Sequence, residues 1–351
     1  MREKVNGFVG VMAVAILCMV SGLCMVWGIA PVVLAVYVAA CAVCGRYMIT
    51  CIGCAAGVAA GSMGIAGLLH AYEYMIPGPA YSGVMVTEKY LVLLGLAMCL
   101  MKIVYSRNSR SYVRVIVVMS AAVLMGNIVV YADNMLMAAA YGVVEAAIFM
   151  CASVILKPGI GLLYTYICGD ASDVERDESW NISQGIVSLM ALAAVVLWVV
   201  PGEDIYGVNP AFMLALVLIL YAVYRTGAVY GCGMAAVAGS IVSVKLNDSR
   251  WLMWMLLVTL VMLIGRALTG RRKVSASLFY VLGCVLASVA DGTVLWNGSG
   301  REIAFYYINI AVPVVLFACI PGALLGAMDE ETDPRVFRRP LRRLTDSRPA
   351  R

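Results

Sequence analysis

The sequence has little charge and almost no histidine. Only 13% of its 351 residues are charged, 63% are hydrophobic, and His70 is the single histidine. So little polar surface cannot cover a soluble domain, and this excludes an ordinary soluble protein. One histidine, without a Ser/His/Asp set, an HExxH motif or a phosphate-cradling loop, excludes most acid–base and nucleophilic machinery. We therefore expect no enzyme and no catalytic residue.

What the sequence does contain is a series of apolar runs of about twenty residues, each separated from the next by a short polar or charged island. Such runs predict an all-α polytopic membrane protein embedded in a lipid bilayer. We expect twelve spans, or ten if the second and third dip into the membrane without crossing it. The expected spans are 6–26, 29–45, 47–69, 90–105, 115–131, 135–156, 182–200, 207–224, 228–244, 251–265, 274–290 and 303–325.

The basic residues are divided unevenly between the two sides of these spans. If the amino terminus is inside, twenty of the 25 Lys and Arg fall in inner segments, and Lys102 lies near the inner end of a span. The four in outer segments are Lys89, Lys245, Arg250 and Arg301. This bias predicts that both termini are cytoplasmic at a bacterial inner membrane. Because the basic residues flank spans, the net charge of +5 does not indicate a nucleic-acid partner.

A pair of spans occurs twice. The segment from Gly28 to Ser62 reads GIAPVVLAVYVAACAVCGRYMITCIGCAAGVAAGS, and the one from Gly207 to Ser243 has the same organisation. Pro31 and Arg46 differ by fifteen in number, as do Pro210 and Arg225. Six spans separate the copies, so the sequence predicts two parallel repeats, an arrangement found in some transporters.

The repeats predict four segments along the chain. We expect a first membrane half, a cytoplasmic connecting loop whose apolar start lies at the membrane surface, a second membrane half and a basic cytoplasmic tail. These segments are 1–156, 157–181, 182–328 and 329–351.

Glycines recur at helical spacing in both copies and form one face of a helix. Such faces allow helices in membranes to approach closely. They serve either packing within the chain or self-association between chains, and the pattern leaves both open. The glycines are Gly53, Gly57 and Gly61 in the first copy and Gly227, Gly231 and Gly239 in the second.

Glu145 lies near the middle of the expected span 135–156. An ionised carboxylate there costs about 2.5 kcal/mol or more, so intramembrane carboxylates are candidates for function. The alternative is a protonated side chain that forms a hydrogen bond with a neighbouring helix, through Asn127, Tyr131 or Tyr141. Both interpretations remain open at this point.

Twelve cysteines are present, most of them inside spans, where cysteine is usually a small packing residue. Cys41-x-x-Cys44 and Cys51-x-x-Cys54 have the spacing of metal ligands, but neither has histidine or carboxylate neighbours. We expect no metal and no cofactor.

Several of these stretches together resemble the amino-terminal membrane region of the bacterial stage II sporulation protein E family. The likeness covers most of residues 20–325 and rests on spacing and glycine pattern. The stretches that carry it are Gly28-Ile-Ala-Pro31, Gly53–Gly67, Glu145-Ala-Ala, Ile182-Ser-Gln-Gly-Ile-Val-Ser, Gly227–Ser240, Gly265-Arg266-Ala-Leu and Gly283.

This resemblance implies a membrane anchor, localisation and oligomerisation module linked to sporulation and the asymmetric septum. In that family a ten-span membrane region is joined to a segment that binds division proteins and to a manganese-dependent phosphatase. The phosphatase aspartates have no counterpart in this sequence, so no catalytic residue is carried over. We expect either a shortened or split version, or a module that works with a separate cytoplasmic phosphatase or division-protein partner. The alternative is a small-molecule or ion transporter with parallel repeats.

Overall fold

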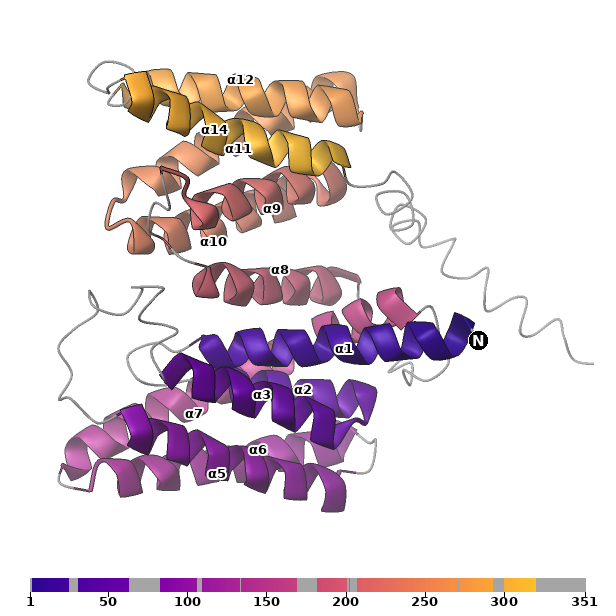
Figure 1. Cartoon of the computed structure of the whole chain (residues 1–351), viewed down its shortest axis with the longest axis vertical. Coiled ribbons are helices and arrows are strands. Elements are labelled where there is room, and N and C mark those ends of the chain that lie inside the picture. The colour runs from indigo at the N-terminus through magenta and orange to yellow at the C-terminus, as the bar shows by residue number, and fades with distance from the viewer. Residues whose placement is uncertain are drawn as a thin grey trace, which may run out of the picture. The chain divides into compact units, whose positions relative to one another are not determined.

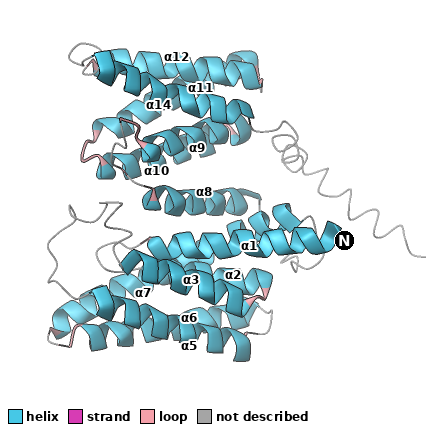
Figure 2. Ribbon diagram, in the orientation of Figure 1, coloured by secondary structure: helices cyan, strands magenta, loops and turns pink. Residues whose placement is uncertain are grey.

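The computed structural model describes residues 2–24, 31–62, 83–105, 109–132, 134–168, 182–200, 202, 207–270, 272–292 and 300–319. This part of the chain forms twelve helices. Figure 2 shows helices and loops in it, and no strand. The helices, labelled in Figure 1, are α1 Arg2–Leu23, α2 Pro31–Cys44, α3 Tyr47–Ser62, α5 Gly83–Ile103, α6 Ser109–Val130, α7 Met135–Cys168, α8 Ile182–Val199, α9 Pro210–Thr226, α10 Ala228–Lys245, α11 Arg250–Thr269, α12 Lys273–Asp291 and α14 Gly300–Cys319.

Most of these helices follow the spans expected from the apolar runs. Five of them, α6, α7, α10, α11 and α12, are long and apolar enough to cross a membrane. Most of the others are shorter apolar helices of 10–17 described residues. The chain is therefore an all-α polytopic membrane protein, as its composition predicts.

The start of α9 shows why a helix begins where it does. Asn209 has an extended backbone, and its side-chain Oδ1 accepts a hydrogen bond from the Phe212 N–H at 2.8 Å. Pro210 follows at the first helical position, where its missing N–H leaves no hydrogen bond unmade. In the first copy α2 likewise begins at a proline, Pro31.

The helices form two compact units, Met1–Pro201 and Gly202–Arg351. In the first unit α2 is the central helix, with α1, α3, α5 and α7 packed against it, and every residue of Val33–Cys41 has no exposed surface. Its 14 residues span only about 21 Å at 1.5 Å per residue. That is shorter than the hydrocarbon core of a bilayer, about 30 Å.

The second unit repeats the packing order of the first. In the first unit α2 packs on α3, α3 on α5, α5 on α6, α6 on α7, and α7 returns to α2. In the second unit the same sequence of neighbours runs through α9, α10, α11, α12 and α14. The repeat seen in the sequence is thus also a repeat in helix packing.

The two copies differ at the turn between their first two helices. In the first copy the turn glycine is Gly45, with φ +62°, and Arg46 follows it. In the second it is Gly227, with φ +93°, and Arg225 precedes it in the last turn of α9. The landmark arginines therefore lie on opposite sides of the turn, because α9 is three residues longer than α2 (17 against 14).

Helix α7 continues to Cys168, so the helix runs beyond the expected span 135–156 and into the first residues of the expected connecting loop 157–181. Pro158 lies inside the helix, where it lacks a backbone N–H. The next residue, Gly159, donates its N–H to the Ser188 hydroxyl of α8 at 2.6 Å. This contact packs α8 on α7, and α8 belongs to the first compact unit although the sequence assigned residues 182–328 to the second half.

Candidate functional site

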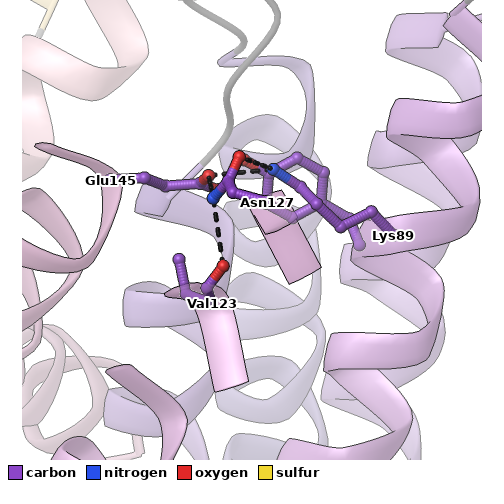
Figure 3. Close-up of polar contacts among 5 residues, drawn as sticks. Lys89, Val123, Asn127 and Glu145 are labelled. Atoms are coloured by element: carbon purple, nitrogen blue, oxygen red, sulfur yellow. Dashed lines mark hydrogen bonds and ion pairs between the residues drawn. The ribbon is translucent and has the colours of Figure 1, made fainter. Parts of the chain in front are cut away.

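Three helices of the first unit bring four polar side chains together inside the protein. Lys89 and Tyr90 come from α5, Asn127 from α6 and Glu145 from α7. Tyr90, Asn127 and Glu145 are completely buried, and Lys89 is 8% exposed. We call these four residues the Lys89–Glu145 cluster, and Figure 3 shows three of them labelled, with dashed lines for their contacts.

Every polar group of the cluster has a partner. The Lys89 ammonium lies 2.8 Å from Glu145 Oε2 and donates a second hydrogen bond to Asn127 Oδ1 at 3.3 Å. Asn127 Nδ2 donates to Glu145 Oε2 at 2.6 Å and to the Val123 carbonyl at 3.0 Å. The Tyr90 hydroxyl donates to Glu145 Oε1, and the ammonium lies 4.6 Å from the centre of the Tyr90 ring.

Two glycines make room for this arrangement. A Cβ on Gly126 of α6 would lie 3.4 Å from Lys89 Cγ. The aliphatic part of the lysine side chain therefore packs on α6 at a position that has no side chain. A Cβ on Gly142 of α7 would lie 3.1 Å from the Leu124 side chain. Helices α6 and α7 therefore approach closely enough for Asn127 to reach Glu145.

The structure confirms neither Tyr131 nor Tyr141 as a partner of Glu145. Their rings instead stack on each other, with centroids 5.1 Å apart and planes at 9°. Tyr131 comes four residues after Asn127, and Tyr141 four residues before Glu145, so both lie one helical turn from the cluster. The stack therefore lies between the cluster and the ends of α6 and α7 that meet at residues 130–135.

Sequence reasoning missed Lys89. The sequence places Lys89 in an outer segment, just before the expected span 90–105, but the helix begins earlier than that span. Helix α5 begins at Gly83, so Lys89 lies inside it, more than one turn from the end. The sequence does contain one indication of such a residue. Glu145 has no basic residue in its own span, and a buried carboxylate is stable only with a cation close to it.

The cluster places one positive and one negative charge in a protein interior within a membrane protein. Two charges so placed are tolerated because each offsets the other, and Asn127 and Tyr90 add hydrogen bonds to them. The contacts of the cluster therefore hold α5, α6 and α7 together.

The second unit has neutral polar contacts at the corresponding places. Asn309 of α14 accepts from the Asn209 N–H at 3.0 Å and donates to the Gly207 carbonyl at 3.2 Å, which holds the start of α9. Ser288 of α12 lies three residues before the end of its helix, as Asn127 does in α6, and contacts the Tyr306 hydroxyl at 2.8 Å. Neither contact carries a charge.

The predicted glycine faces pack within the chain. A Cβ on Gly53 or Gly57 of α3 would lie 2.7 Å and 2.1 Å from the carbonyls of Ala15 and Met19 in α1. In α10, Gly231 meets Val223 of α9, and Gly239 meets Leu252 of α11. Gly227 lies in the turn before α10, with a positive φ, and a Cβ on it would lie 3.4 Å from the Arg266 guanidinium of α11.

Of the remaining predicted residues, Gly61 is half-buried. His70, most of the loop 157–181 and the tail 329–351 lie outside the described residues. In the described ranges no three His, Cys, Asp or Glu side chains are arranged to hold a metal ion. Cys41, Cys44, Cys51 and Cys54 form no disulfide, and Cys41 Sγ lies 3.2 Å from the Thr50 hydroxyl.

The chain was compared with protein-family models, with curated proteins and with solved structures, and none of the three comparisons found a match.

Proposed function

We propose that this chain is a membrane anchor, localisation and oligomerisation module like the membrane region of stage II sporulation protein E. It would act at the bacterial inner membrane, with both termini cytoplasmic, in sporulation and signalling at the asymmetric septum. Its partners would be the bilayer, further copies of itself and a cytoplasmic phosphatase or division protein. It would itself carry no enzymatic activity and no cofactor.

The observation that carries this proposal is the closure of the Lys89–Glu145 cluster. Each of the four side chains already has a partner within the cluster, and the partners come from three helices. The glycines of α3 and α10 are likewise used for packing inside the chain. Polar groups and glycines that are used for contacts inside the chain fit a scaffold better than a pathway.

Localisation in sporulating cells tests the proposal. A fluorescent fusion to the full chain should gather at the division site when the asymmetric septum forms. A fusion of the Gly57→Leu variant provides the control, since the leucine would meet the Met19 carbonyl and disturb α1–α3 packing. Uniform membrane labelling by the wild-type fusion throughout septation would contradict a localisation role.

Oligomerisation needs its own measurement. Because Gly53, Gly57, Gly231 and Gly239 meet helices of the same chain, self-association would use other faces of the protein. Photobleaching of single fusions in native membrane particles should show more than one copy per particle. One-step bleaching at all expression levels would remove oligomerisation from the proposal.

The second candidate is a small-molecule or ion transporter with parallel repeats, in which Glu145 couples proton movement to uptake. One observation favours it, a buried charge pair within the first of two similarly packed units. Proton-coupled uptake into membrane vesicles should then collapse in Glu145→Gln. Uptake that is unchanged in this variant would exclude the coupling role.

A further inference from the structure

The length of α7 places one end of the first unit at the surface of the bilayer. Lys157 comes 22 residues after Met135, the start of α7, and this is a rise of about 33 Å at 1.5 Å per residue. The hydrocarbon core of a bilayer is about 30 Å thick. A helix that begins at one surface of this core therefore reaches the lipid headgroups of the opposite surface near Lys157.

Four helices meet at this depth. The Tyr112 hydroxyl of α6 donates to the Ser153 carbonyl of α7 at 2.7 Å, and the Lys157 ammonium lies 4.6 Å from the centre of the Tyr112 ring. The ring of Tyr105, just after the end of α5, packs edge-on against Tyr112 with centroids 6.4 Å apart. The Tyr105 hydroxyl donates to the Ala42 carbonyl of α2 at 3.4 Å. We call this part of the first unit the Tyr105–Tyr112 end.

Three exposed cations surround these contacts. Arg46 lies in the turn between α2 and α3, Lys102 in the last turn of α5 and Arg114 in the second turn of α6. Each is within about one helical turn, along the chain, of a residue that makes the contacts above. In the described part of the chain, the side chains of these three form no ion pair and no hydrogen bond.

The described carboxylates of the first unit lie well away from this end. Glu88 comes 14 residues before Lys102 on α5, and Glu145 comes 12 residues before Lys157 on α7. These separations are about 21 Å and 18 Å along the helices. Glu145 is also paired with Lys89. The described side chains of the Tyr105–Tyr112 end therefore carry an excess of positive charge.

Basic residues at the corresponding end of the second unit are held by the protein itself. Lys273, at the start of α12, donates to the Ala318 carbonyl of α14 at 2.7 Å. Arg266 of α11 donates to the Val223 carbonyl of α9. Both carbonyls lie in the last turn of their helices, where a cation is favourable. Cations held in this way are less available to another partner than those of the Tyr105–Tyr112 end.

We propose that the Tyr105–Tyr112 end binds the headgroups of anionic phospholipids, and that Arg46, Lys102 and Arg114 contact the phosphate. Basic residues near a membrane surface attract anionic lipids. A phosphodiester without an ammonium group leaves its negative charge for the protein, whereas a zwitterionic headgroup carries its own positive charge. The acyl chains would lie along the exposed apolar side chains of α5 and α6. The proposal is independent of the anchor function and of the side of the membrane that this end faces.

Lipid binding by the full chain tests this inference. In native mass spectrometry from a neutral detergent, phosphatidylglycerol should bind about tenfold or more tightly than phosphatidylcholine with the same acyl chains. In the triple variant Arg46→Gln/Lys102→Gln/Arg114→Gln this preference should fall to about twofold or less. The control Lys245→Gln/Arg250→Gln/Arg272→Gln removes the same charge from the second unit and should keep the wild-type preference.

Three results would overturn the proposal. They are equal binding of the two lipids by the wild type, an equal loss of preference in the two triple variants, and displacement of phosphatidylglycerol by soluble glycerol phosphate at a matching concentration. The last result would make free phosphate the ligand.

Salt provides a readout that needs no variant. Because charges at a membrane surface are screened, the wild-type preference for phosphatidylglycerol should shrink severalfold between about 0.1 M and 1 M ammonium acetate. A preference that is unchanged at the higher concentration would contradict the site, even where the triple variant does not fold.

Discussion

Lys89 and Glu145 are 56 residues apart in the sequence, yet their side chains meet at 2.8 Å with 3% and 0% of their surfaces exposed. The pair connects the first helix of a three-helix segment to the last, with Asn127 of the middle helix bonded to both. One contact therefore fixes the relative depth of α5, α6 and α7. The negative charge of Glu145 also offsets the positive charge of Lys89, which by itself is unfavourable in a membrane-spanning helix.

The first prediction concerns the energy of this pair. Lys89→Met and Glu145→Gln should each lower the free energy of unfolding by about 3 kcal/mol, because each leaves a buried charge or polar group without its partner. The double variant should lose much less than the sum, since neither charge remains. Unfolding in mixed micelles with increasing SDS gives the coupling energy through the double-mutant cycle. Additive losses would contradict the contact.

The exposed pair Arg250–Asp248 supplies the matched control. Its atoms are equally close, at 2.7 Å, but the side chains are 59% and 25% exposed. Solvent screens such a pair, so Asp248→Asn should change stability by less than about 1 kcal/mol. A larger loss of stability at the Lys89–Glu145 pair than at the Arg250–Asp248 pair would then be due to burial, because the two distances are nearly the same.

The second prediction concerns the packing of α1 on α3. Gly57→Leu should destabilise the protein by about 3 kcal/mol or more, because even its Cβ would lie 2.1 Å from the Met19 backbone carbonyl. Gly95→Leu on α5 is the matched control, since a Cβ there has nothing within 4 Å. Thermal unfolding in detergent should separate the two variants. Equal melting temperatures would argue that the Gly57 face does not meet α1.

The third prediction concerns the start of α9. Asn309→Leu should cost about 1–3 kcal/mol, because the Asn209 N–H and the Gly207 carbonyl would both lose a partner inside the protein. Amide exchange should rise first at residues 207–213. Asn309→Asp keeps the acceptor and loses the donor, so its effect should be smaller than that of leucine if the Asn209 contact is the stronger one. Wild-type exchange in Asn309→Leu would contradict this arrangement.

The fourth prediction is a pH dependence at the turn between α10 and α11. Hydrogen bonds from the Arg250 side chain and backbone hold the pKa of Asp248 below its ordinary value. A lowered pKa in the folded state means that the contribution to stability is present above the ordinary carboxyl pKa. It is lost as the pH falls through the lowered value. Exchange of the Arg250 amide should therefore be protected near neutral pH and rise only under clearly acidic conditions, and Asp248→Asn should abolish the change.

The helices themselves were largely predictable, and the site only in part. Apolar runs locate spans well because a bilayer requires continuous helices of fixed length, and α8, α10 and α12 begin and end within one residue of their predicted spans. The starts of α1 and α5 were placed too late, because charged residues near their amino ends hide helix that continues beyond the apolar run.

Glu145 and Asn127 could be identified from the sequence because each is a polar residue within an apolar run. Lys89 was not, since its partner lies two helices away and only the three-dimensional packing joins them. Helix α7 extends beyond the expected span 135–156, through Pro158. Proline usually marks the end of a helix, but here α7 continues through it, and the contact of Gly159 with Ser188 of α8 holds that part of the helix in place.

The burial of α2 over Val33–Cys41 has a consequence for how the protein is made. Ninety residues lie between the end of α2 at Cys44 and the start of α7 at Met135, the helix packed most extensively on it. A ribosome-bound chain that has just released α2 into the membrane therefore leaves it facing lipid on the side that α7 will cover. The central helix of the first unit is among the first to be synthesised and among the last to be enclosed.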